Sequence, residues 1–172
     1  IKASHDFWAS LPETVDCSTL RLCILDLQRW HDVYFVTSRV GKDVKWQTEQ
    51  WLILHLGIER PTVLISNEKG LCAKALKLDC YLDDNADNAN DVVQATLPKT
   101  EKEFIKAAER LPARAIPLDY LKLRETPTTR VYLLDKSYNR EPGVPEQPMR
   151  VDTRIRRVAT LGQFIDAELT NL

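Results

Sequence analysis

The strongest constraint on the fold is the alternation of short apolar runs with segments of helical periodicity. The runs, rich in β-branched and aromatic residues, are 32–37, 62–66 and 80–83. The segments with apolar residues at helical spacing are 18–30, 43–56 and 70–77. Short, continuously apolar runs are typical of strands covered on both faces. Their alternation with helices predicts an α/β fold, a parallel sheet with crossover helices.

Individual positions support these helices. Leu20, Ile24 and Leu27 share one face of the helix expected at 18–30, because their spacing follows the helical period. Gly57 follows the last periodic residue of the second helix, where glycine commonly ends a helix.

The pattern is looser in the second half of the chain. We expect helices at 100–110 and 161–169, strands at 130–135 and near 157–159, and a proline-containing loop at 139–150. The length predicts one domain over 1–172. Within it we expect a core at 1–93, an insertion at 94–129, and a C-terminal strand and helix at 130–172.

The composition excludes several classes of protein. With 24 basic and 25 acidic residues the net charge is -1, which argues against a general nucleic-acid or membrane-surface binder. No apolar run approaches the roughly 20 residues that a membrane span needs. The 5 glycines form no glycine-rich phosphate loop, and the 4 cysteines form no C-x-x-C pair. With no secretory signal at the start, we expect a cytoplasmic protein with reduced thiols.

Polar residues follow each expected strand. They are Thr37, Ser38 and Arg39 after the first run, Lys69 after the second, and Asp83 with Asp84 at the end of the third. The carboxyl ends of parallel strands meet at one edge, so we expect these side chains to lie together. Hydroxyls and a lysine suit a phosphate, and adjacent carboxylates suit Mg²⁺. The combination indicates metal-assisted phosphoryl transfer.

Each of these residues also has an ordinary interpretation. A Thr-Ser pair after a strand commonly caps a helix, and a single lysine is commonly a solvated side chain. The acidic pair is more informative, because two adjacent carboxylates repel each other and sheet packing does not require them. We therefore weigh Asp83 and Asp84 as functional residues.

In their order, these motifs resemble the haloacid dehalogenase (HAD) superfamily. Within it, the chain is most similar to the 5'(3')-deoxyribonucleotidase-like branch with its phage and bacterial relatives. The matching segments are Phe7–Pro12, Val33–Arg39, Lys69-Gly70, Cys80–Asp84 with Asn88, and Tyr138-Asn139. The match covers about half of the chain well. It implies a Rossmann-like, three-layer αβα core around a parallel sheet.

The resemblance implies roles for these residues. Thr37 and Ser38 would hold a phosphate, Lys69 would neutralise its charge, and Asp83 with Asp84 would bind Mg²⁺. Lys74 is a rival for Lys69, but it lies about one helical turn further from the strand-end edge. Arg39 would bind the phosphate or a base, or point into solvent.

The first motif of the family, D-x-D on a strand near the N-terminus, does not occur in the 172 residues. Its first aspartate is the nucleophile. We therefore expect the N-terminal nucleophile strand and the cap to be missing. That strand would lie between the strands ending at Thr37 and Asp83, which then need other neighbours. The chain is a truncated piece of a longer protein, half of a split enzyme, or a non-catalytic relative; within it, Asp135 is the first alternative nucleophile.

Two functions follow. The first is a Mg²⁺-dependent phosphatase, a hydrolase acting on nucleoside monophosphates or similar small phosphomonoesters, whose site is incomplete in this chain. The alternative is a non-catalytic HAD-like binding module, a homodimer or a subunit whose partner chain fills the missing strand. A nucleic-acid role is the weakest hypothesis. It would rest on the basic cluster Arg150, Arg154, Arg156 and Arg157.

Overall fold

The computed structural model describes residues 6–13, 17–99, 127–135 and 152–169. The described fold is α/β, and every strand pairing in it is parallel. The chain divides into two compact units, residues 1–67 with 161–172 and residues 68–160. No helix in the described ranges is long and apolar enough to cross a membrane.

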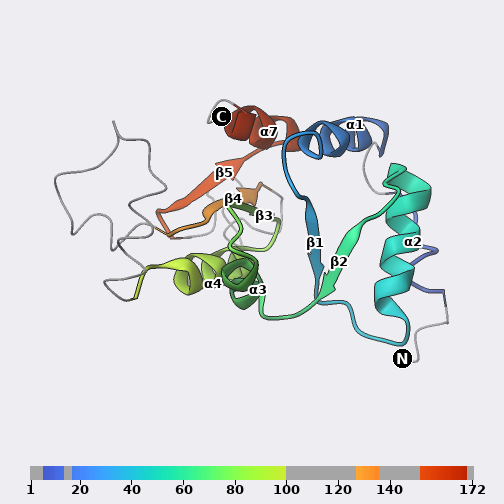
Figure 1. The fold of residues 1–172 in the computed structure, drawn as a ribbon, viewed down its shortest axis with the longest axis horizontal. Helices are drawn as coiled ribbons and strands as arrows, with labels where there is room; N and C mark the ends of the chain where they lie inside the picture. Colours follow the sequence, from blue (N-terminus) through green and yellow to red (C-terminus); the bar gives the residue numbers. More distant parts are fainter. Residues whose placement is uncertain (1–5, 14–16, 100–126, 136–151, 170–172) are drawn as a thin grey trace, which may run out of the picture. The chain divides into compact units, whose positions relative to one another are not determined.

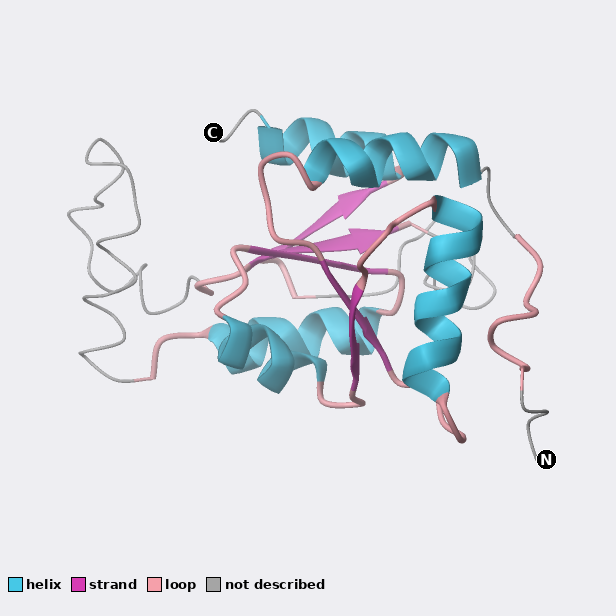
Figure 2. Cartoon of the chain, turned by 45° about the vertical axis from the view of Figure 1, so that its right-hand side comes forward, coloured by secondary structure: helices cyan, strands magenta, loops and turns pink. Residues whose placement is uncertain are grey.

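The first unit is built on a two-stranded parallel sheet. Its elements are α1 (Cys17–Leu27), β1 (Tyr34–Thr37), α2 (Val44–Leu56), β2 (Thr62–Ile65) and α7 (Leu161–Leu169). Tyr34 is opposite Thr62 and Thr37 is opposite Ile65. Helix α2 lies along this sheet, and α1 and α7 lie side by side (Figures 1 and 2).

The core of the first unit joins α1, α2 and β2. Its buried members are Cys17, Ile24, Leu52, Leu56, Ile58 and Val63. Burying an aliphatic side chain of this size contributes about 1.5–3 kcal/mol. Leu20 packs against the cluster and Leu27 is buried, so the apolar face expected for α1 is confirmed. Gly57 ends α2 with a φ of 62°, a backbone conformation that glycine adopts at no steric cost.

The second unit is built on a three-stranded parallel sheet. Its elements are α3 (Lys69–Leu76), β3 (Cys80–Asp83), α4 (Ala86–Thr96), β4 (Arg130–Leu134) and β5 (Ile155–Val158). The strand order is β3-β4-β5, with Asp83 opposite Leu133 and Val131 opposite Ile155. The carboxyl ends of the strands therefore lie at one edge of this sheet.

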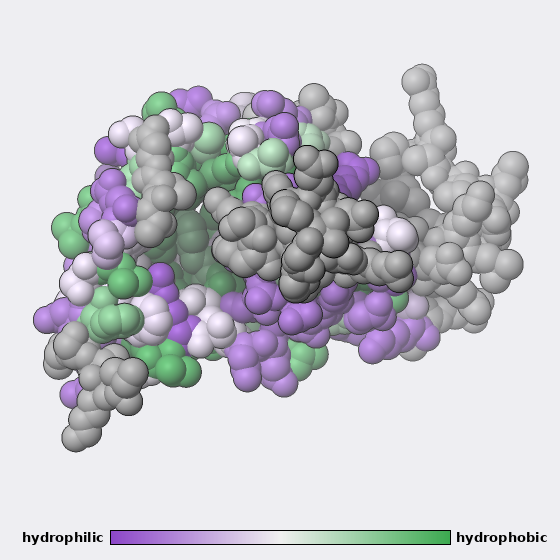
Figure 3. All heavy atoms as spheres, turned by 180° about the vertical axis from the view of Figure 1, so that it is seen from behind, coloured by the Kyte–Doolittle hydropathy of each residue, from purple (hydrophilic) through white to green (hydrophobic). Residues whose placement is uncertain are grey.

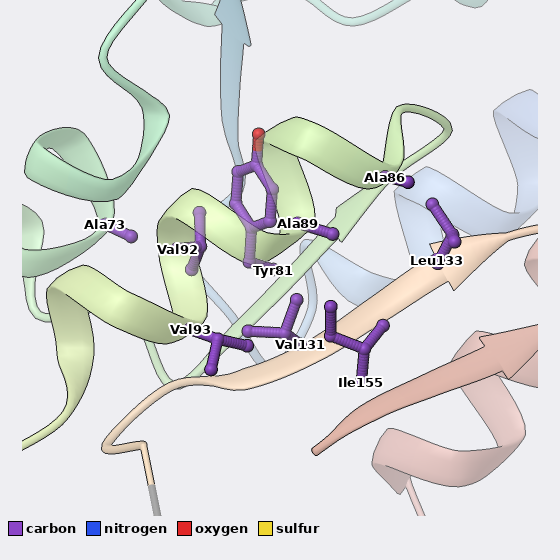
Figure 4. Packing of buried hydrophobic residues seen from close by; sticks show 9 residues of the cluster. All are labelled: Ala73, Tyr81, Ala86, Ala89, Val92, Val93, Val131, Leu133 and Ile155. Carbon is purple, nitrogen blue, oxygen red and sulfur yellow. The ribbon is translucent and has the colours of Figure 1, made fainter. Parts of the chain in front are cut away.

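The core of the second unit lies between this sheet and the two helices. It contains Ala73, Tyr81, Ala86, Ala89, Val92, Val93, Val131, Leu133 and Ile155 (Figure 4). Helices α3 and α4 approach closely at Gly70, where an added Cβ would lie 2.6 Å from the carbonyl oxygen of Asp91. Only glycine fits this position without movement of the backbone.

The structure corrects two expectations. Helix α4 was not expected from the sequence, because its alternating Ala, Asp and Asn residues hide the apolar face that Ala89, Val92 and Val93 bury. The strands form two separate parallel sheets where one was expected. In the described part of the chain, β1 pairs only with β2, and β3 pairs only with β4. The helix expected at 100–110 and the loop at 139–150 lie outside the described residues.

The surface and the thiols complete the description. The 4 cysteines, all of them in the described ranges, form no disulfide; Cys17 is buried and the other 3 are partly buried. On the face that Figure 3 presents, hydrophobic residues (green) reach the surface between hydrophilic ones (purple).

Candidate functional site

Lys69 is a buried cation at the start of α3. It is only 3% exposed, which is rare for a lysine. Its ammonium makes no hydrogen bond or ion pair with any residue that the structure describes. Burial lowers the pKa of Lys69, while the charges of Asp83 and, less strongly, Cys72 act in the opposite direction. The structure thus brings Lys69 and Asp83 together, with an ammonium that lacks a direct partner.

Asp83 is held firmly at the carboxyl end of β3. The Tyr81 hydroxyl donates to its Oδ2 at 2.6 Å, and the backbone N–H of Asn85 donates to its Oδ1 at 2.8 Å. The Asn88 amide nitrogen donates to both oxygens, at 3.2 and 3.3 Å. These donors come from a strand, a turn and a helix, so they fix the carboxylate in one orientation.

Local sequence explains this arrangement. Alternate residues of a strand share one face, which places Tyr81 beside Asp83. Asn85 caps α4 by accepting hydrogen bonds from the backbone N–H groups of Asp87 and Asn88, and this orients the first turn toward the strand end. In Figure 4 the hydroxyl of Tyr81 points away from Val131. Burial, and then the charge of Asp83, raise the pKa of Tyr81, so this hydroxyl stays a donor.

The two carboxylates predicted to bind Mg²⁺ differ in their surroundings. Mg²⁺ commonly keeps several waters and takes one or two protein carboxylates plus phosphate oxygens. Asp84 is exposed and suits this role. The four hydrogen bonds to Asp83 occupy the roughly four lone-pair sites of a carboxylate, so a metal there would displace the longer Asn88 bonds. The described residues contain no group of three or more His, Cys, Asp or Glu that could hold a metal unaided.

The predicted phosphate residues Thr37, Ser38 and Arg39 belong to the first unit, at the end of β1. The hydroxyl of Thr37 accepts a hydrogen bond from the backbone N–H of Arg39 at 3.4 Å, and Ser38 is exposed. The Arg39 guanidinium donates to the Thr48 hydroxyl at 3.2 Å and lies 4.8 Å from the centre of the Trp8 ring. Burial lowers the pKa of Arg39. Arg39 is therefore partly buried and anchored in its own unit.

The rival residues are placed differently. Lys74 is exposed on α3, in contrast to Lys69. Asp135, the alternative nucleophile, accepts a hydrogen bond from the Arg157 guanidinium at 3.0 Å. An ion-paired carboxylate is a weak nucleophile, so this geometry disfavours Asp135 in that role.

The basic cluster weighed for nucleic acid is partly neutralised. Arg154 forms an ion pair with Asp152, and Arg157 forms one with Asp135. Arg150 lies outside the described residues, as do Tyr138 and Asn139 of the sequence motif.

Sequence reasoning missed Tyr81 as part of the site, although its position two residues before Asp83 was a usable signal. A scan of protein-family models, a search of curated proteins and a search of solved structures each find no match to this chain. The function is therefore argued from the residues and their geometry.

Proposed function

We propose that this chain carries the phosphate- and metal-binding part of a HAD-like, Mg²⁺-dependent phosphohydrolase of the 5'(3')-deoxyribonucleotidase type. Its substrate class is nucleoside monophosphates or similar small phosphomonoesters. The single observation that carries the proposal is Lys69, a lysine that is only 3% exposed and whose ammonium has no hydrogen-bond or ion-pair partner among the described residues, near the fixed carboxylate of Asp83. A buried cation without a direct partner is costly to fold, and an anionic ligand offsets that cost.

The residues divide the work by their chemistry. Lys69 would donate charge-assisted hydrogen bonds to the phosphate, and such bonds are stronger than those between neutral groups. Asp84 would hold Mg²⁺, and the bound ion would polarise a phosphoryl oxygen. Asp83 would add negative charge and keep Lys69 protonated, since its charge acts against the effect of burial.

The chemical step needs an attacking carboxylate, and D-x-D is absent from the 172 residues. The proposal therefore takes the nucleophile from a strand that is not part of these 172 residues. The resemblance places that strand between the strands ending at Thr37 and Asp83. Those strands, β1 and β3, are each at the end of a described sheet.

A phosphatase assay tests the proposal directly. The chain would be given an aryl phosphate and a panel of deoxynucleoside monophosphates, with and without Mg²⁺, beside Asp84→Asn. Asp87→Asn is the matched control, because Asp87 is also acidic and exposed and lies in the first turn of α4. Because the proposed nucleophile is not part of these 172 residues, we expect Mg²⁺-dependent phosphate binding without turnover, and Asp84→Asn should abolish this binding while Asp87→Asn keeps it. The absence of both turnover and Mg²⁺-dependent phosphate binding would contradict the proposal.

A second candidate is a non-catalytic binding module, and the sheet edges favour it. Strand edges with apolar side chains and unpaired ladder groups attract another strand. A homodimer or a partner chain that adds a strand at β1 or β3 would satisfy such an edge. Sedimentation of the purified chain measures its mass in solution and so shows whether it forms a homodimer. Phosphate binding without turnover, together with a stable dimer, would favour this candidate over the enzyme.

A further inference from the structure

The first turn of α3 is capped by a residue from another helix. The first backbone N–H groups of a helix have no partner within it, and the residue that precedes the helix commonly accepts from one of them through its side chain. In α3 that residue is Glu68, whose side chain makes no capping hydrogen bond. The backbone N–H of Gly70 donates instead to Oδ2 of Asp91 on α4, at 2.7 Å. Asp91 therefore caps α3 from outside.

The contact between Gly70 and Asp91 is close. A Cβ on Gly70 would lie 2.6 Å from the backbone carbonyl oxygen of Asp91, so the two helices meet at this pair. The residues are 21 apart in the sequence, which makes the cap a tertiary contact. A carboxylate suits the position, because the N-terminus of a helix carries partial positive charge.

Helix α4 is bonded to both halves of the candidate site. Asn88 and Asp91 are three residues apart in α4, and such residues are neighbours on a helix surface. Asn88 donates to the carboxylate of Asp83, and Asp91 accepts from Gly70, the residue directly after Lys69. Two side chains of one helix therefore fix the end of β3 and the start of α3.

Lys69 depends on this support. It is the first residue of α3, it is 3% exposed, and its ammonium has no hydrogen-bond or ion-pair partner among the described residues. Burying a lysine in this way costs free energy, and opening the first turn would return the ammonium to water. The groups whose charge acts on the pKa of Lys69 are Asp83 and Cys72, and Asp91 is not among them. Asp91 therefore acts on Lys69 through the backbone.

We propose that Asp91 is a positioning residue of the candidate site, which caps α3 at Gly70 and thereby keeps Lys69 buried near Asp83. Its effect on phosphate binding rests on the proposed function. The placement of Lys69 does not, because it can be measured without a ligand.

Three variants of the full chain test the inference. Asp91→Ala removes the acceptor, and Asp91→Asn keeps an oxygen that can accept from Gly70 while it removes the charge. Asp87→Ala is the matched control, because Asp87 is an exposed aspartate of the same helix whose side chain bonds to no described residue. Circular dichroism and thermal unfolding verify that every variant is folded.

Acylation of lysine amines, quantified by mass spectrometry, measures the placement of Lys69. The exposed Lys74 of the same helix is the internal reference. We expect Lys69 to react more slowly than Lys74 in the wild type. Asp91→Ala should raise the Lys69/Lys74 ratio of rates about fivefold, the factor that corresponds to a helix cap of about 1 kcal/mol. Asp91→Asn and Asp87→Ala should keep the wild-type ratio. An unchanged ratio in Asp91→Ala, or the same rise in Asp91→Asn, overturns the inference.

Hydrogen exchange of the wild type needs no variant. The Gly70 amide should be protected although it lies in the first turn of a helix, and fast exchange would overturn the cap.

Titration with inorganic phosphate and Mg²⁺ separates this inference from the proposed function. Asp91→Ala should bind phosphate about fivefold more weakly than the wild type, and Asp91→Asn at least as tightly, because it keeps the cap and removes a negative charge. If the acylation rates change as expected and the wild type binds no phosphate, the proposed function fails and the positioning of Lys69 stands. If phosphate binds equally to the wild type and to Asp91→Ala, the inference fails and the proposed function stands.

Discussion

Tyr81→Phe isolates the contribution of one hydrogen bond to the candidate site. The substitution removes the donor that lies 2.6 Å from Asp83 Oδ2 and keeps the buried ring in the core (Figure 4). Hydrogen bonds to charged groups contribute about 1.5–3 kcal/mol. Asp83 is partly buried and keeps its bonds from Asn85 and Asn88, so we expect the lower end, about 1.5 kcal/mol.

The assay is urea denaturation followed by circular dichroism, together with thermal unfolding. For a chain of this length, a loss of 1.5 kcal/mol corresponds to a fall of about 3–6 °C in Tm. Tyr34→Phe is the matched control, because the Tyr34 hydroxyl bonds to no described residue, and its effect should stay within about 0.5 kcal/mol. A double-mutant cycle with Asp83→Asn then measures the coupling. Equal stabilities for Tyr81→Phe and Tyr34→Phe, or a coupling near zero, would refute the assigned bond.

Three further changes test other parts of the structure. Gly70→Ala should lower the free energy of unfolding by about 1–3 kcal/mol, because its Cβ would lie 2.6 Å from the Asp91 carbonyl oxygen; denaturation with no loss would contradict that packing. Gly57→Ala should cost about 1–2 kcal/mol at its φ of 62°, measured in the same way, and a stabilised variant would show that α2 ends differently. Hydrogen bonds from Arg154 lower the pKa of Asp152, so the carboxylate stabilises the fold above its ordinary pKa, and this contribution disappears as the pH falls through the lowered folded pKa. Wild type should therefore be more stable than Asp152→Asn near pH 6 and lose that advantage near pH 2, and a difference that is constant with pH would contradict the assignment.

Apolar periodicity predicted most of the described elements. The strand at 80–83 and the helix at 161–169 match the structure at both ends, and Gly57 ends α2 as expected. Helix α1 ends at Leu27 rather than at residue 30, because residues 28–30 form hydrogen-bonded turns and not a further turn of helix. These elements depend on local spacing, which the sequence shows directly.

Longer-range features could not be read in this way. The apolar stripe of α4 is made of small residues between Asp and Asn, so the hydrophobic pattern in its sequence is weak. The helix is buried through the close approach of α3 at Gly70, which spacing along the sequence does not show. The division of the strands into two sheets depends on pairing between distant segments. The bond from Tyr81 to Asp83 follows from strand geometry, but the burial of Lys69 depends on how α3 packs, which spacing alone does not reveal.

The most direct test of the central claim is the binding of inorganic phosphate, in the presence of Mg²⁺, to the wild type and two lysine variants. Lys69→Met removes the ammonium of a buried lysine, and Lys74→Met removes the ammonium of an exposed lysine on the same helix. Isothermal titration should show binding to the wild type and to Lys74→Met, with affinity at least about tenfold weaker for Lys69→Met. Equal affinity in the two variants, or no phosphate binding to the wild type, would contradict the account.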